Sequence, residues 1–378
     1  MALVVTAILA IPVVSVSAAG AGAPPTLSSF ASTPTRHNFQ FPGTVNVNLL
    51  VSNQSKALVD LYYANFTNEV VLYDAPHNTS KVVQKFVPGG FYTFLATAIA
   101  AGGAFLLGWV NNGTETFSQV SLTGKVTSIA LPLQSNLYWT FLFGNATSVF
   151  ATAPGNELLE LNPATGKVRA NYTGLLPTGV SLTSLLPAGP RLYLGGFRAP
   201  PSGGAYAWFG YLTVSPGTVT SVSKARSYPI HLSSSFYAVI ALGGNIFVGG
   251  SLVNNTTTPF GFRTVGGLLF EYVPSTGNWT NESWRLPMKG AGVFSFEPWH
   301  GSIVLSESRY TFSTFTINVT GGIYTQSLAG SGWINRTSLL PATFVIGIYL
   351  VTAESSDWYF SGGNNTAGGL GEVVAVRA

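Results

Sequence analysis

A recurring proline divides most of this chain into units of similar length. An apolar or aromatic residue precedes each of seven prolines spaced 44 to 58 residues apart: Pro42, Pro88, Pro132, Pro177, Pro229, Pro287 and Pro341. Within each unit an alternating apolar run, a turn, a second apolar run, a variable loop and a hairpin-like pair of runs recur. Four short strands repeated at this period are typical of the blades of a β-propeller.

The two ends of the repeat region predict how the ring closes. After Pro341 only 37 residues remain, enough for three strands ending in GEVVAVRA but not for a fourth. Residues 37–41, before the first proline, form a surplus strand in the fourth-strand position. We therefore predict an all-β fold, a seven-bladed β-propeller of four-stranded antiparallel blades, whose N-terminal strand completes the last blade and removes the exposed edges.

This repeat sets the predicted domain organisation. The propeller spans residues 37–378, with blades near 43–87, 88–131, 132–176, 177–228, 229–286, 287–340, and 341–378 plus 37–41. Residues 24–36, rich in Pro, Ser and Thr, are a linker.

The N-terminal segment predicts export. Residues 1–23 begin with an apolar run and continue with small residues suited to cleavage, so we expect a secretory signal peptide. The alternative is an uncleaved membrane anchor, although about 17 apolar residues are few for a span. The membrane would then be reached only through this segment.

Composition excludes several functions. Charged residues make up only 8% of the chain, and no basic run supplies the clustered Lys and Arg that a nucleic-acid groove needs. The absence of Cys excludes disulfides and thiolate chemistry, and none of the four His stands at metal-ligand spacing. We therefore expect no metal and no cofactor.

One unit carries a family resemblance. Residues 245–287 combine Gly249–Gly250, then Tyr272, Trp279 and Pro287, and this pattern resembles a kelch repeat. The fourth and seventh units keep a Gly pair, and the others keep length and apolar pattern. The Pro-x-Thr-Gly turns are also similar to other propeller families, including quinoprotein-type repeats. The glycines predict close backbone approach, and Tyr272 and Trp279 are expected to pack between blades.

Asn-x-Ser/Thr sequons are unusually frequent. Together with the signal peptide they predict a secreted, N-glycosylated surface protein. Alternatively, turn-rich β proteins are simply rich in these residues. The sequons begin at Asn53, Asn65, Asn78, Asn112, Asn145, Asn171, Asn254, Asn255, Asn278, Asn281, Asn318, Asn335 and Asn364.

The sequence contains no catalytic constellation, so we predict no catalytic residues. Instead, the long loops of the fourth, fifth and sixth units each combine an arginine with aromatic residues, a composition typical of recognition surfaces. This predicted binding crescent comprises Arg198, Tyr206, Trp208, Phe262, Arg263, Arg309 and Tyr310. The alternative is that these side chains only pack the loops over the channel.

The function expected from these features is binding at the cell surface. We predict an extracellular adhesive or surface-assembly propeller, of a filament or surface layer, whose partners are proteins or carbohydrates or further copies of itself. The alternative is a secreted carbohydrate-active lyase or hydrolase with a site in the propeller channel. Because a chain with few carboxylates loses little when they are protonated, the composition also suits an extracellular protein of an archaeal acidophile.

Overall fold

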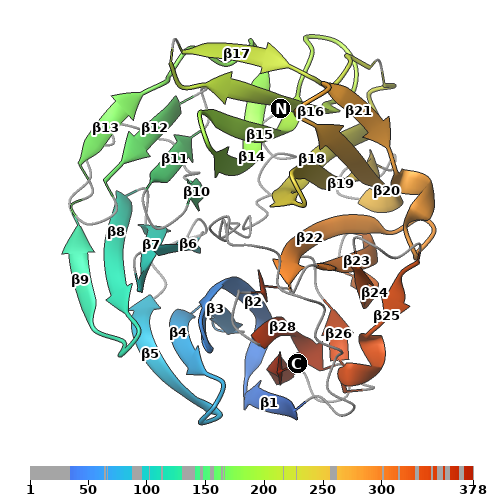
Figure 1. Cartoon of the computed structure of the whole chain (residues 1–378). Helices are drawn as coiled ribbons and strands as arrows, with labels where there is room; N and C mark the ends of the chain where they lie inside the picture. The colour runs from blue at the N-terminus through green and yellow to red at the C-terminus, as the bar shows by residue number, and fades with distance from the viewer. Residues whose placement is uncertain are drawn as a thin grey trace.

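The computed structural model shows seven blades arranged around a ring (Figure 1). It describes residues 35–377 except 64, 66, 87–95, 102, 112–113, 130–140, 145–147, 154–156, 163–164, 166, 216, 227, 256–261, 300–301, 314–315, 328–331, 342–343, 347–351, 354–357 and 366–369. The predicted signal peptide and nearly all of the linker lie outside the described residues. The predicted all-β, seven-bladed fold is confirmed.

Blades 1 to 4 are separate four-stranded antiparallel sheets. In each blade the first strand lies nearest the axis of the ring and the fourth lies at the outside (Figure 1). Their strands, in order, are β2 (Thr44–Asn53), β3 (Lys56–Tyr63), β4 (Asn68–Asp74) and β5 (Thr79–Phe86); β6 (Ala96–Ala101), β7 (Ala104–Asn111), β8 (Thr114–Ser121) and β9 (Val126–Ile129); β10 (Phe141–Gly144), β11 (Val149–Ala153), β12 (Glu157–Leu161) and β13 (Val168–Asn171); and β14 (Val180–Ala188), β15 (Arg191–Arg198), β16 (Tyr206–Thr213) and β17 (Thr218–Ser221).

Blades 5 and 6 are joined into one eight-stranded sheet, because β20 of blade 5 pairs with β23 of blade 6. A short 3-10 helix follows the last strand of each blade, η1 (Ser283–Arg285) and η2 (Thr337–Leu339). The strands are β18 (Leu232–Leu242), β19 (Asn245–Asn255), β20 (Phe262–Val273) and β21 (Asn278–Asn281) in blade 5, and β22 (Gly292–Trp299), β23 (Ser302–Ser313), β24 (Thr316–Ser327) and β25 (Ile334–Asn335) in blade 6.

Blade 7 closes the ring as predicted. It contains β26 (Phe344–Ile346), β27 (Thr352–Ala353), β28 (Trp358–Asn365) and β29 (Leu370–Arg377), and its outer strand is β1 (Thr35–Phe41) from the other end of the chain. β1 pairs antiparallel with β29, with Phe39 opposite Val373. Because β1 begins at Thr35, residues 35–36, which the sequence placed in the linker, belong to this strand.

The Gly pairs mark a bulge in the innermost strand of a blade. In blade 5 the register shifts by one residue between Phe236 and Ala238, opposite Gly249–Gly250. A Cβ atom on Gly250 would collide with the main-chain oxygen of Ser235, so glycine is required there. Blade 6 has the same bulge, but Ser306–Glu307 occupies the place of the glycines.

The core of the ring lies between neighbouring blades. The largest described cluster connects blades 4, 5 and 6 and includes Tyr272, with Trp279 packed against it. The predicted packing of these two side chains between blades is therefore confirmed. In the part of the chain that the structure describes, no helix has the length and apolarity needed to cross a membrane.

Candidate functional site

The three arginines of the predicted crescent occupy different environments. Arg198, at the end of β15, donates from Nε to the main-chain oxygen of Thr178 at 2.9 Å. Arg309 on β23 donates from Nη2 to the main-chain oxygen of Lys289. Arg263 on β20 is exposed. Two of the arginines therefore hold the segments that connect blades, whereas Arg263 points its charge toward solvent.

Of the crescent's four aromatic residues, two are buried and two have side chains outside the described residues. Tyr206 and Trp208 on β16 are buried, with 5% and 1% of their surface exposed, and the Trp208 indole donates to Ser221 Oγ at 3.1 Å. These two residues therefore pack within the interfaces of blade 4 rather than offer a surface for binding. The side chains of Phe262 and Tyr310 lie outside the described residues, although their main chains belong to β20 and β23.

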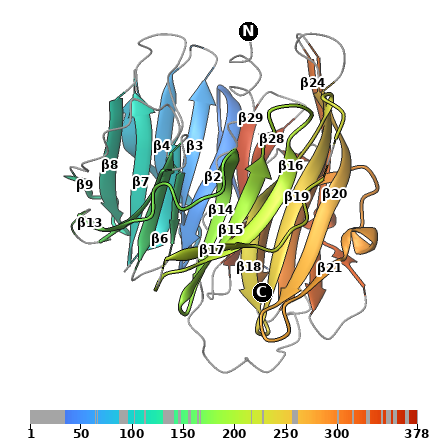
Figure 2. The same cartoon turned by 90° about the horizontal axis from the view of Figure 1, so that it is seen from above.

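The long loops predicted in blades 5 and 6 are largely extended strands. β19, β20, β23 and β24 have 11 or 12 residues, whereas the strands of blades 1 to 4 have ten or fewer. Near their ends Phe262 pairs with Phe312, and Arg263 pairs with Thr311. In Figure 2 the end of β24 projects beyond the neighbouring strands. We call this extension of blades 5 and 6 the joined hairpins.

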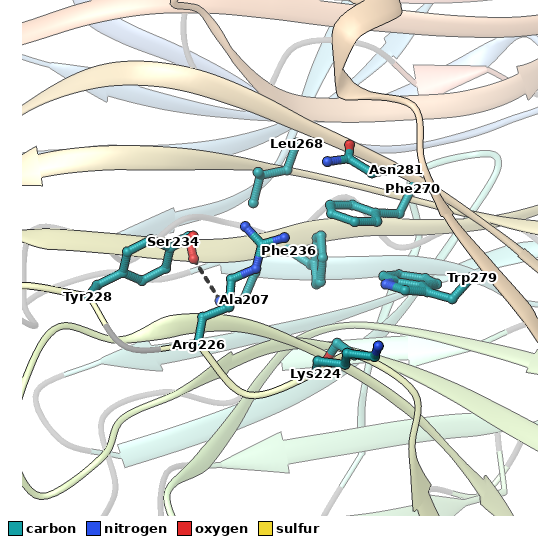
Figure 3. Close-up of a pocket in the computed structure, with 11 residues that line it drawn as sticks. Ala207, Lys224, Arg226, Tyr228, Ser234, Phe236, Leu268, Phe270, Trp279 and Asn281 are labelled. Atoms are coloured by element: carbon teal, nitrogen blue, oxygen red, sulfur yellow. Dashed lines mark hydrogen bonds between the residues drawn. The ribbon is translucent and has the colours of Figure 1, made fainter.

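A pocket of about 230 Å³ opens between blades 4 and 5 (Figure 3). Sequence reasoning did not find it, because its lining comes from β16, the connection after β17, and three strands of blade 5. The lining residues are Ala207, Ser223, Lys224, Arg226, Tyr228, Ser234, Phe236, Leu268, Phe270, Trp279 and Asn281.

Stacked aromatic rings make one wall of this pocket. The ring of Trp279 lies between Phe209 of blade 4 and Phe270 of blade 5, with centroid separations of 4.9 and 4.7 Å and planes within 9° of parallel. Phe236 meets the Trp279 ring edge-to-face at 6.1 Å. Figure 3 shows the rings of Phe270 and Trp279 lying parallel, one above the other. Because its faces are covered, Trp279 contributes mainly a ring edge to the pocket.

Two positively charged side chains also line the pocket. Lys224 and Arg226 are exposed residues of the connection between β17 and β18, and none of the described lining residues is Asp or Glu. Four ion pairs are found among the described residues, and none of them includes either cation. The pocket therefore combines cationic groups with aromatic edges.

Carboxyl groups are buried in several blades. Burial raises the pKa of Glu307 on β23 to about 8, and the N–H of Met288, which donates to Oε2 at 2.7 Å, offsets this only in part. Burial also raises the pKa of Asp60 on β3 to about 7, partly offset by Tyr62 and Asn68. The pKa of Glu372 on β29 is raised by burial as well. These groups therefore favour the protonated form at higher pH than ordinary carboxyls do.

The described carboxylates are either deeply buried or held by nearby partners. The buried ones are 2% exposed or less. The others are held by nearby partners, as in the contacts of Glu160 with Ser148 and Tyr172 and of Glu271 with Asn245. Within the described ranges no three His, Cys, Asp or Glu side chains gather as metal ligands would.

Several sequons are also structural turns. The Oδ1 atoms of Asn65, Asn171, Asn281 and Asn335 each accept the N–H of the Ser or Thr two residues later, at 2.8 to 3.0 Å. This is an Asx turn, and at the last three it ends the outer strand of a blade. Turn geometry therefore accounts for part of the sequon excess. The Nδ2 atom, to which an N-linked glycan would be attached, is not used in this hydrogen bond.

Other sequons use Nδ2 to hold the fold. Asn255 donates from Nδ2 to Ser233 Oγ at 3.1 Å. Asn78 donates to the main-chain oxygen of Asn38, and Asn53 donates to that of Ala104. These seven sequons therefore fall into two groups with different access to Nδ2.

Comparisons with known proteins support the fold alone. No protein-family model and no curated protein sequence matches this chain. It is similar to a solved structure of YCF48 bound to D1 peptide, with 11% identity, a TM-score of 0.56, and coverage of 96% of this chain and 98% of that chain. A chain of a mitotic checkpoint complex matches at 12% identity and a TM-score of 0.54, with the same coverage. The propeller domain of the Trilobed protease from Pyrococcus furiosus, described as having an open velcro topology, matches at 10% identity and a TM-score of 0.51, covering 85% of this chain and 93% of that one.

Proposed function

We propose that this chain is a secreted propeller that binds proteins at the cell surface, as an adhesive or surface-assembly component without catalytic activity. The observation that carries the proposal is the pair of joined hairpins, which extends one edge of the ring and carries the exposed Arg263. Propellers are typical protein-binding scaffolds. Two of the similar structures contain such partners, a D1 peptide and a checkpoint complex.

The charge pattern supports an extracellular role in an acidic setting, such as that of an archaeal acidophile. Asp60 and Glu307 are buried where a neutral carboxyl is tolerated and a charged one is costly. Their raised pKa values favour the folded chain at low pH. Few exposed charges would also limit repulsion between copies in a surface layer or filament.

Labelling of intact cells tests the location. Gold-conjugated antibodies against the folded propeller should label the surface of unpermeabilised cells that produce the protein. Labelling that requires permeabilisation would overturn the extracellular assignment.

A second experiment tests the partner. Purified protein should bind isolated cell envelopes, and binding should survive treatment of the envelopes with glycosidases but not with protease. Arg263→Glu should weaken this binding, whereas Arg169→Glu, a change of equal charge on an outer strand of blade 3, should not. Loss of binding after glycosidase treatment alone would assign a carbohydrate partner instead.

A further inference from the structure

We infer that the pocket between blades 4 and 5 binds the carboxylate of an acidic side chain from a protein partner. The inference rests on the proposed protein-binding function, and it names the chemistry by which one site would recognise that partner. It is carried by the charge, the aromatic geometry and the size of the pocket.

Charge complementarity points to an anion. Lys224 and Arg226 bring two cations to the pocket, and no acidic side chain is among the described residues that line it. An arginine guanidinium can hold a carboxylate through two parallel hydrogen bonds. Nearby acidic groups in this chain are already engaged, since Glu282 pairs with Arg285. The complementary charge therefore comes from another molecule.

The hydrogen-bonding groups in the pocket narrow the possibilities further. Ser223 Oγ accepts the N–H of Phe209 and donates to the main-chain oxygen of the same residue, whereas Ser234 Oγ accepts the N–H of Ala207 and keeps an O–H group that can donate into the pocket. Lys224 and Arg226 are the charged donors toward a ligand, and Ser234, Tyr228 and Asn281 add neutral ones. A site whose main donors are positively charged favours an ionised acceptor over a neutral one.

The aromatic wall favours an amino-acid side chain over a sugar. Trp279 is covered on its faces by Phe209 and Phe270, so it offers no open ring face on which a pyranose could stack. Its edge, which carries the positive part of the ring quadrupole, suits an anion. Leu268 and Phe270 provide apolar contacts for the methylene groups of a Glu or Asp stem.

Size is consistent with a single side chain. The volume of about 230 Å³ lies below the roughly 300–1,000 Å³ of pockets that hold drug-sized ligands. The rings that form the wall are held by several mutual contacts, so this wall is preformed and only the exposed Lys224 and Arg226 side chains need ordering when a ligand enters.

The inference is tested by selecting peptides on the protein and comparing their affinities for a pocket variant and a matched control variant. Phage-displayed random twelve-residue peptides are selected on the full chain and then measured individually against Lys224→Ala/Arg226→Ala. The control is Lys125→Ala/Lys167→Ala, which removes the same charge from exposed positions on blades 2 and 3. All four side chains are exposed, so thermal melting should show that both variants remain folded.

The expected result is a set of peptides that share Asp or Glu. They should bind the pocket variant roughly tenfold or more weakly, bind the control unchanged, and lose affinity when the shared Glu is replaced by Gln. Enriched peptides that lack acids, or that bind the pocket variant equally well, overturn the inference.

An array of glucuronate- and sialate-terminated glycans forms the second arm. Binding to such glycans that is lost in the pocket variant would assign an acidic sugar and overturn the peptide assignment. If envelope binding is lost with Arg263→Glu but persists with Lys224→Ala/Arg226→Ala, the inference fails while the proposed function stands.

Discussion

The interface between blades 4 and 5 and the interfaces made by blade 6 bury different kinds of side chain. Between blades 4 and 5 the core includes stacked rings, such as Phe209 of blade 4 on Trp279 of blade 5 and Tyr211 of blade 4 on Tyr272 of blade 5. Around blade 6, apolar packing is interrupted by Glu307 on the side facing blade 5, and by Ser306, Ser361 and Glu372 on the side facing blade 7.

This difference indicates which blade interfaces should change in stability with pH. Aromatic rings are stabilised by burial and by their mutual geometry, neither of which depends on pH. A buried carboxyl is tolerated only while it is neutral or paired. We therefore expect the blade 4–5 interface to be insensitive to pH and the interfaces of blade 6 to weaken as pH rises.

The largest expected effect is on the aromatic interface. Trp279→Ala should lower the free energy of unfolding by about 3 kcal/mol, because it removes a ring stacked on two others. The matched control is Trp284→Ala, since Trp284 is 80% exposed and should contribute less than about 0.5 kcal/mol. Urea unfolding followed by circular dichroism measures both. Equal losses from the two substitutions would show that the stack does not stabilise the ring.

The second largest expected effect is the change of stability with pH that Glu307 causes. The unfolded carboxyl ionises near pH 4.5, whereas burial holds the folded one protonated to about 8, so its contribution to stability is present below pH 4.5 and lost as the pH rises to 8. The loss should be on the order of a few kcal/mol. Glu307→Gln cannot ionise and keeps an oxygen for the N–H of Met288, so stability should vary less between pH 5 and 8.

A set of urea curves across this range checks the prediction. The slope that remains in Glu307→Gln should begin to level off near pH 7, where the folded Asp60 is half ionised. A slope identical to that of the wild type would contradict the assignment of the pH dependence to blade 6.

A smaller effect is expected from two serine hydroxyls, the buried one of Ser306 and the half-buried one of Ser283. Ser306 Oγ has no hydrogen-bond partner among the described residues, so Ser306→Ala should be neutral or stabilise by up to about 1 kcal/mol. Ser283 Oγ accepts the N–H of Leu269 at 2.9 Å, and Ser283→Ala should destabilise by about 1 kcal/mol. Thermal melting compares them. If Ser306→Ala destabilises as much, its hydroxyl has a partner outside the described residues.

The smallest expected effect on the fold is that of N-glycans, and access to Nδ2 should decide where they are added. Asn171 in blade 3 and Asn335 in blade 6 end equivalent outer strands with Nδ2 outside the Asx-turn hydrogen bond, so both should be highly occupied. Asn255 uses Nδ2 as a donor within the fold, and its occupancy should be lower. Glycopeptide mass spectrometry of native protein measures the three sites. Equal occupancy at all of them would show that this hydrogen bond does not govern glycan addition.

Much of the fold could be predicted because it repeats along the chain. The proline spacing predicted the blades, and in the structure the strands of each of blades 1 to 6 lie between consecutive prolines of the series. The surplus strand before Pro42 predicted the closure by β1. The binding crescent was harder to predict, because the alternation of apolar and polar residues along a strand does not show which of its two faces packs against a neighbouring blade. Tyr206 and Trp208 looked like loop aromatics and are buried instead.

The sequence by itself determined the number of blades, the order of their strands and the closure of the ring, because these follow from local periodicity and from counting strands at the two ends. Tertiary packing was needed to bring Lys224 and Arg226 into one pocket with Trp279, more than fifty residues later, between blades 4 and 5. It also decided that Glu307 is buried where blade 5 has glycine. Contacts between blades join residues with no shared periodicity, so packing alone establishes them.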